Sequence, residues 1–350
     1  MQRRSLLRAL AALPAAYAWP VSSFAQDRAA EKSAATGVVS VNSLPKLKGK
    51  LTLYLGRGEG GLYEKILKSI QRRNPDFELR VRRGPSTALA NTLVAESRFG
   101  KPRADVFWSI DASSLGLVVN AVEPAPLESD LVGLLKPEYR YERWLPISGR
   151  FRTLAYNSDS VNPSELPDSI MKLPDQDLRF GWAPAYGAFQ SFVTAMLLLE
   201  GEDATGTWLE SLKSRSKSYA GELNVVMGAS QGESEIGFAN HYYTLRLLQG
   251  RPDTPLGLAF TRGDAGCLLN ASGTVILKPS TLARDFVRHL MTNEVQGYLA
   301  REAFEVPLLD GVSNPEGLPP LASLQPPKVD LEKLADVRPT LSLLRKTGVL

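Results

Sequence analysis

Short apolar runs alternate with amphipathic stretches along most of the chain from Leu51 onward. The apolar runs have the length and β-branched or aromatic content of strands, and the stretches between them repeat apolar residues at helical spacing. In the first part, strands are predicted at 51–55, 77–83 and 104–108, and helices at 63–73 and 86–98. Strands that alternate with helices in this way predict an α/β fold with a mainly parallel sheet that is covered on both faces.

The same alternation begins again after residue 150. Strands are predicted at 150–156, 179–183 and 235–239, and helices at 188–200, around Trp208 and within 279–302. A proline-rich extended segment leads into a final helix over about 330–346, which Pro339 should break or kink. Two α/β units in one chain suggest two lobes with a cleft between them. Ligands of such sheets bind at the carboxyl ends of the strands, so strand-end residues are the candidates for a site.

The N-terminal 25 residues have the layout of an export signal. Arg3, Arg4 and Arg8 precede an apolar stretch that is too short to span a bilayer, and Ser23-Phe24-Ala25 has the small residues of a cleavage site. We therefore expect a periplasmic protein that is cleaved near Ala25. The adjacent arginines resemble a twin-arginine signal, with an ordinary secretory signal as the alternative. Residues 26–50 lack periodicity and predict a flexible lead-in.

Composition excludes several functions. The chain has 350 residues, of which 43% are hydrophobic. Losing the three arginines of the signal lowers the formal charge from +4 to +1, so nothing indicates a nucleic-acid partner. A single cysteine, Cys267, excludes an intrachain disulfide and a multi-thiolate metal cluster. The only histidines are His241 and His289, and no nucleophile, base and acid converge by motif, so we expect no enzyme and no permanent cofactor.

Polar and flexible residues follow several predicted strands. The glycine-rich loop after 51–55 contains Gly58 and Glu59 and lets backbone approach a ligand, but it has the spacing of neither a P-loop nor a dinucleotide-binding turn. Ser109 and Asp111 follow 104–108. Arg150 and Arg152 stand two apart and therefore share one side of a strand, where paired guanidinium groups suit carboxylate or phosphate oxygens. A solvated strand edge is the alternative for this pair.

Tyr242 and Tyr243 stand where an apolar strand gives way to a helical pattern. Phenolate is a hard oxygen ligand that can bind ferric iron. The alternative is an interfacial role, in which the rings are packed and the hydroxyl groups lie in water.

Five separated segments, ADVFWS, ISGRFRTLAYN, GWAPAYGAF, GESEIGFANHYY and DAGCLLNASGTVILK, occur in an order that resembles the periplasmic ferric-ion-binding proteins of ABC importers. These are type II periplasmic binding proteins, and the similarity runs from about Leu51 to the C-terminus. It implies two hinged lobes with a central ligand cleft and crossovers near 148–152 and 266–273. The first lobe would comprise 51–150 and about 275–315, and the second about 151–274 and 316–350.

The resemblance also assigns residues. The family's metal-binding tyrosine pair falls on Tyr242 and Tyr243. The anion-binding groups fall on Arg150, Arg152, the Gly187-Ala188 turn and Asn240. Some relatives have an extra tyrosine in the segment of Tyr186, which would be a third phenolate or else a stacking or lid residue.

Two expected iron ligands are missing. Gly58 stands where many relatives have histidine, and Ile110 stands where they have glutamate. Glu59 and Asp111 are the adjacent acids that could replace them, although a shift of one residue can turn a side chain away. Ser109 is expected near the ligand. Glu222 replaces an asparagine and could supply a carboxylate or repel an anion; a solvated loop residue is the alternative.

The leading hypothesis is the substrate-binding component of an ABC importer. It would be a monomer that captures Fe(III), with phosphate, carbonate or citrate as synergistic anion, and delivers it to an inner-membrane permease. One alternative is metal-independent binding of an organic or phosphorylated anion by the arginines and tyrosine hydroxyls. Another is a solute sensor that signals to a membrane receptor kinase.

Overall fold

A computed structural model describes residues 39–56 and 61–350 of the protein. The predicted export signal, Gly58 and Glu59 lie outside the described residues. Within them, helices and strands alternate as the sequence predicts, and no helix is both long and apolar enough to cross a membrane. The first lobe contains β1 (Gly49–Leu55), α2 (Leu62–Arg73), β2 (Phe77–Arg83), α3 (Ser86–Arg98), β3 (Val106–Ser109), α4 (Ala112–Val122), α5 (Ser129–Val132), α10 (Thr281–Leu290), α11 (Asn293–Ala303) and β10 (Val306–Pro307).

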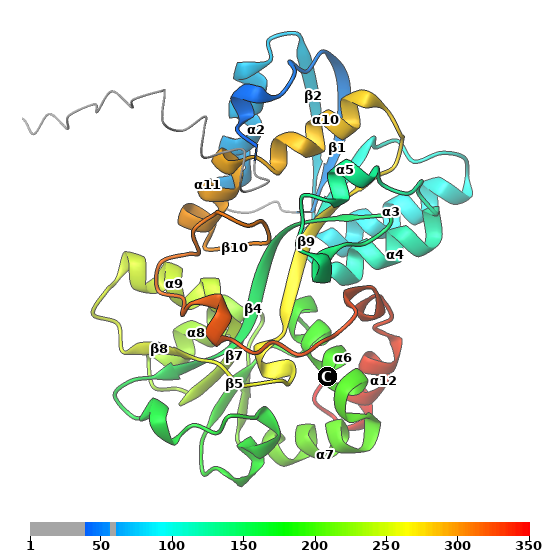
Figure 1. Ribbon diagram of the computed structural model, residues 1–350. Coiled ribbons are helices and arrows are strands. Elements are labelled where there is room, and N and C mark those ends of the chain that lie inside the picture. Colours follow the sequence, from blue (N-terminus) through cyan, green and yellow to red (C-terminus); the bar gives the residue numbers. More distant parts are fainter. Residues whose placement is uncertain (1–38, 57–60) are drawn as a thin grey trace, which may run out of the picture.

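The second lobe lies below the first in Figure 1. It contains β5 (Phe180–Trp182), α6 (Gly187–Glu200), α7 (Glu202–Lys213), β6 (Ser216–Ser218), α8 (Glu222–Ser230), β7 (Ile236–Asn240), α9 (His241–Gly250), β8 (Leu256–Ala259) and α12 (Arg338–Lys346). Two long strands, β4 (Leu145–Asn157) and β9 (Leu269–Ile276), run between the lobes (Figure 1). The crossover expected near 148–152 lies in β4, and the one expected near 266–273 begins three residues before β9 and continues into it.

The strands form one connected sheet in the order β2-β1-β3-β9-β4-β7-β5-β6, with β8 and β10 also paired to β4. Pairing is parallel among β1, β2 and β3 and among β5, β6 and β7, as alternating strands and helices require. The prediction of a mainly parallel sheet is wrong at the centre, where β9 is antiparallel to both β3 and β4, and β4 is antiparallel to β7. The reason is that the two crossover strands pass between the lobes in opposite directions.

Strand β4 joins the two halves through consecutive residues. From Leu145 to Phe151 it pairs with β9, and from Arg152 to Tyr156 it pairs with β7. Because β4 belongs to both halves, side chains at its midpoint lie at the junction between the lobes.

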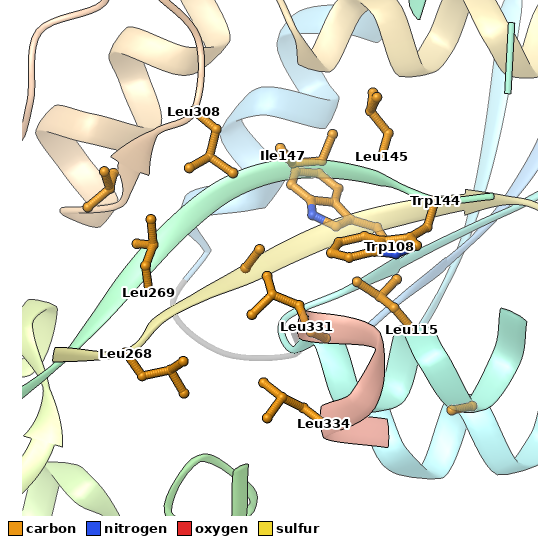
Figure 2. Close-up of a cluster of buried hydrophobic side chains, with 14 of the residues drawn as sticks. Trp108, Leu115, Trp144, Leu145, Ile147, Leu268, Leu269, Leu308, Leu331 and Leu334 are labelled. Atoms are coloured by element: carbon orange, nitrogen blue, oxygen red, sulfur yellow. The ribbon is translucent and has the colours of Figure 1, made fainter. Parts of the chain in front are cut away.

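The core of the first lobe reaches the C-terminal segment (Figure 2). Trp108 and Trp144 are fully buried, and Leu331 and Leu334 of the 3₁₀ helix η7 (Leu331–Ala335) pack against the same apolar cluster as Leu115 of α4. The indole N–H of Trp144 donates to Glu332 at 3.0 Å. The tail then returns to the second lobe, where α12 packs on α6 and α7. The C-terminal segment therefore contacts both lobes.

Two local expectations can be compared with the structure. Pro339 lies in the first turn of α12 and separates it from η7, so the predicted break is confirmed; at that position the missing N–H costs no helical hydrogen bond. The sequence predicts a flexible lead-in through residue 50, but Leu47 is buried and β1 begins at Gly49. Folded structure therefore begins before residue 50. The remaining 3₁₀ helices are η1 (Val41–Ser43), η2 (Pro137–Tyr139), η3 (Pro163–Glu165), η4 (Ile170–Asp175), η5 (Ala265–Cys267) and η6 (Leu321–Ser323).

Candidate functional site

The tyrosine pair lies in the first turn of α9, directly after β7. Tyr242 is 4% exposed and Tyr243 is half-buried, with their ring centroids 4.4 Å apart. Tyr186, at the start of α6, places its hydroxyl oxygen 3.0 Å from that of Tyr243. Three phenols from two different helix starts thus meet at one place. The Tyr243 hydroxyl therefore has a phenol partner, whereas the alternative interpretation of the tyrosine pair placed its hydroxyl groups in water.

The environment keeps Tyr186 and Tyr243 protonated. Burial, followed by the neighbouring Tyr242 and Glu222, raises the pKa of Tyr186 to about 12. Burial raises the pKa of Tyr243 further, with contributions from Tyr242 and Tyr186. Both phenols are therefore neutral near pH 7, and any cation that binds them as phenolates must displace their protons.

Arg150 is buried on β4 beside the tyrosines. It is 4% exposed, its guanidinium carbon lies 6.0 Å from the Tyr242 ring centroid, and its Nε and Nη2 have no hydrogen-bond partner among the described residues. Burial alone lowers the pKa of Arg150, but the surrounding Tyr242, Glu305 and Asp111 outweigh this effect and raise it. The alternative of a solvated strand edge is wrong, because the strand runs between the lobes.

Arg152 is buried as well, but its charge is already paired. Its Nη1 lies 2.6 Å from a carboxylate oxygen of Glu222, and the two side chains are 3% and 0% exposed. Its Nη2 donates to the Ala188 carbonyl at 2.6 Å. The other Glu222 oxygen accepts the backbone N–H of Asn240 at 2.9 Å. The alternative of a solvated loop residue for Glu222 is wrong, because Glu222 is the first residue of helix α8 and its carboxylate is buried in an ion pair with Arg152.

Further hydrogen-bond donors surround this pair. The side-chain Nδ2 of Asn240 and the Nε of Arg152 are buried without a partner among the described residues. Gly187 opens helix α6 next to Tyr186 and is exposed. No atom of the residues that the structure describes lies within 4 Å of the position that a Gly187 Cβ would take. The first N–H groups of a helix have no intrahelical acceptor and favour anions. The contacts thus form two groups of predicted residues. One contains Arg150, Tyr242, Tyr243 and Tyr186, and the other contains Arg152, Glu222, Ala188 and Asn240. Gly187 lies between Tyr186 and Ala188 in the chain.

Asp111 serves mainly as a helix cap. It precedes α4, and its two carboxylate oxygens accept the Ser114 N–H at 2.7 Å and the Ser114 hydroxyl at 3.2 Å. The Ser109 hydroxyl donates to the Asp111 carbonyl at 3.0 Å and accepts the Asp111 N–H at 3.2 Å. Both oxygens of this predicted alternative ligand are thus engaged. In residues 39–56 and 61–350, no group of three or more His, Cys, Asp or Glu side chains is placed to hold a metal ion.

The same helix start contacts the second lobe. The Ser113 hydroxyl of α4 lies 3.0 Å from that of Ser191 on α6. Asn270 of β9 accepts the Ala112 N–H at 3.3 Å. A surface cavity of about 640 Å³ lies elsewhere, among residues 97–102, 121–125 and 277–279, and includes none of the predicted site residues.

His241 connects the tyrosine helix to both lobes, which the sequence did not indicate. Its Nδ1 accepts the Phe151 N–H at 3.0 Å, and its Nε2 lies 2.6 Å from the Phe304 carbonyl, to which the neutral ring can donate. Burial lowers the pKa of His241 to about 4, so the ring is neutral. Phe151 and Phe304 lie 90 and 63 residues from His241 along the chain, so no local pattern could predict these contacts. The position of His241 next to Tyr242 was the only indication in the sequence of a role near the site.

Two lobes joined by crossover strands, with polar strand-end residues of both halves near the junction, define the fold of a periplasmic binding protein. No family model matches the sequence. The chain is 30% identical over 285 residues to the Fe(3+)-binding periplasmic protein of Serratia marcescens, covering 78% of this chain and 83% of that protein. It is 30% identical over 258 residues to the major ferric iron-binding protein of Neisseria meningitidis, covering 70% and 78%.

The fold comparison agrees with the sequence comparison. Iron-bound HitA from Pseudomonas aeruginosa superimposes with a TM-score of 0.77 at 29% identity, covering 87% of this chain and all of that one. The chain belongs to the family of periplasmic ferric-iron-binding proteins.

Proposed function

We propose that this protein captures ferric iron in the periplasm and is the substrate-binding component of an ABC importer. The observation that carries the proposal is the meeting of Tyr186, Tyr242 and Tyr243, with Tyr186 and Tyr243 joined by a hydroxyl contact of 3.0 Å. Phenolate oxygens are hard donors that stabilise Fe(III). Family membership supports the same ligand.

The chemistry requires deprotonation and charge balance. Bound iron would lower the pKa of each coordinating phenol and release its proton. The positive charge of Arg150 would hold an anion that fills coordination positions left open by Gly58 and Ile110. Phosphate, carbonate and citrate are the candidate anions. Glu59 and Asp111 are weaker candidates as ligands, because Asp111 already caps α4 and Glu59 lies outside the described residues.

Capture would depend on closure of the two lobes around the ligand. The tyrosines belong to the second lobe, whereas Arg150 lies on the strand shared by both and Ser113 reaches across to Ser191. A ligand that contacts both lobes stabilises the closed arrangement by its difference in affinity for the two states. We propose a monomer that is exported through the N-terminal signal and passes iron to an inner-membrane permease.

The proposal is tested with purified protein lacking residues 1–25. Addition of ferric iron with phosphate, carbonate or citrate should produce a phenolate-to-iron charge-transfer band in the visible spectrum. The double variant Tyr242→Phe/Tyr243→Phe should lose most of the band, because only Tyr186 of the three phenols remains. Tyr219→Phe is the control, since that hydroxyl bonds Glu233 on the surface of the same lobe. A colourless wild type in all three anions, or an unchanged band in the double variant, would refute iron capture.

Arg150 and Asn240 have buried donors without a partner in residues 39–56 and 61–350, and these donors favour direct anion binding as the second candidate function. In that case, sugar phosphates or dicarboxylates would raise the melting temperature of the iron-free protein, and the colour test would be negative.

A further inference from the structure

The two buried arginines of the site are not equivalent. Arg150 has two buried nitrogen atoms without a partner among the described residues, whereas Arg152 forms an ion pair with Glu222 at 2.6 Å and also donates to the Ala188 carbonyl. A site with two arginines free to bind an incoming anion would attract a multiply charged one. Here the carboxylate of the protein itself neutralises one of the two.

Glu222 is held firmly in this position. Its side chain is fully buried, and its second oxygen accepts the Asn240 N–H at 2.9 Å. It also stands in the first turn of α8, where the helix dipole favours a negative charge. Each oxygen of Glu222 thus has its own donor. Displacing the carboxylate would leave a buried charge without a partner, which is strongly unfavourable.

We propose that Glu222 determines which anion accompanies the metal. It occupies Arg152 from within the protein, so that the incoming anion is held by Arg150 and the Asn240 side-chain amide. This inference rests on the proposed function, because it assigns the anion of the same site. The Arg150 guanidinium, whose Nε and Nη2 have no hydrogen-bond partner among the described residues, and one amide suit a small, singly charged, planar oxyanion of the bicarbonate class. Phosphate and citrate carry more charge and are discriminated against, because they would lie close to the Glu222 carboxylate.

The direct test compares bicarbonate and inorganic phosphate with wild-type protein. With iron present, affinity is measured by competition with a chelator while following the charge-transfer band. Bicarbonate should strengthen iron binding, and phosphate should change it little. In Glu222→Gln, the amide oxygen can still accept the Asn240 N–H, but Arg152 is released. Phosphate should then strengthen iron binding by about tenfold or more, the range of a charge-assisted hydrogen bond.

A second arm needs neither iron nor colour. Inorganic phosphate is added to the iron-free proteins and the melting temperature is recorded. Phosphate should stabilise Glu222→Gln and leave the wild type unchanged. Glu233→Gln is the matched control, because it removes a carboxylate that pairs with Lys217 on the surface of the same lobe, and it should behave like the wild type.

The outcomes distinguish failure of the role of Glu222 from failure of the proposed iron capture. A wild type that takes phosphate as well as bicarbonate, or a folded Glu222→Gln that gains no phosphate response in either arm, would overturn the role of Glu222. Weaker iron binding by Glu222→Gln in anion-free buffer would also overturn it, by making Glu222 an iron ligand. If Glu222→Gln does not fold, the wild-type comparison of the two anions decides. A wild type without a charge-transfer band refutes iron capture and leaves the phosphate arm interpretable.

Discussion

The site contains side chains that must lose a proton to bind a metal ion and a side chain that is permanently charged. Tyr186 and Tyr243 are held neutral by burial, while Arg150 remains charged in the same environment. The site without its ligand is therefore rich in hydrogen-bond donors, and it becomes a metal-binding site only when phenol protons leave. The proton is the species that competes with iron.

Lowering the pH should therefore weaken iron binding. At a pH below the phenol pKa, each phenolate that forms releases one proton, so affinity should fall by about tenfold per pH unit for each phenolate formed. Chelator competition between about pH 8 and pH 6, corrected for titration of the chelator, measures this slope. Tyr243→Phe should reduce the slope by about one proton, and Tyr219→Phe should not change it. A slope near zero in the wild type would show that phenolates are not the ligands.

Helix starts organise the site at the scale of elements. Helices α4, α6, α8 and α9 begin at Ala112, Gly187, Glu222 and His241, respectively, and each start carries or adjoins a predicted site residue. Asp111 illustrates how one acid can serve a helix instead of a ligand. Its oxygens accept from Ser114, as an N-cap residue requires.

This role makes a specific prediction for Asp111. Replacement by Ala should lower the free energy of unfolding by about 1 kcal/mol through loss of the cap, whereas Asp111→Asn should retain most of it, because asparagine also caps helices well. Neither variant should change the charge-transfer band. Urea unfolding and the visible spectrum check the two parts separately. Loss of the band in a stable Asp111→Asn protein would instead identify Asp111 as an iron ligand.

At the scale of the whole molecule, the lobes are joined by strands β4 and β9, by the C-terminal segment and by His241. The ring of His241 links α9 to Phe151 on β4 and to Phe304 at the end of α11. Its lowered pKa makes this link sensitive to acid. The neutral ring accepts one hydrogen bond and donates another, and a protonated ring could not accept the Phe151 N–H.

The sign of the resulting pH dependence follows from the lowered pKa. The unfolded protein takes up the His241 proton below about pH 6.5, whereas the folded protein does so only near about pH 4. The stability from the neutral ring is therefore complete above about pH 6.5 and is lost as the pH falls toward 4, by up to about 3 kcal/mol.

Urea unfolding of the iron-free protein at about pH 7.5 and pH 5 measures this loss. His241→Gln should be less stable than wild type at the higher pH and should lose less stability on acidification. His289→Gln is the comparison, because that ring also has a pKa lowered by burial but lies in α10, away from the tyrosines. If His241→Gln and the wild type lost the same stability on acidification, protonation of His241 would not be the cause of the loss.

The sequence by itself determined the elements and the position of the phenols. Apolar periodicity placed the strand before Tyr242 and the helix after it, because both patterns are local. Pro339 broke the final helix for an equally local reason. The order of the motifs indicated two lobes and the family. The central antiparallel strands were missed, because strand direction at a crossover depends on where the chain returns and not on the pattern within the strand.

Only the tertiary structure decided how the charged residues are used. Arg152 and Glu222 are 70 residues apart, yet they form a buried pair. Arg150, two positions earlier, keeps donors that have no partner within the described part of the chain. No local pattern distinguishes these arginines, since both lie on one side of the same strand. Asp111 likewise became a cap because of the helix that follows it. Spacing along the chain specifies which side chains can face a ligand, but the charge that a ligand meets depends on which partners the fold brings to each group.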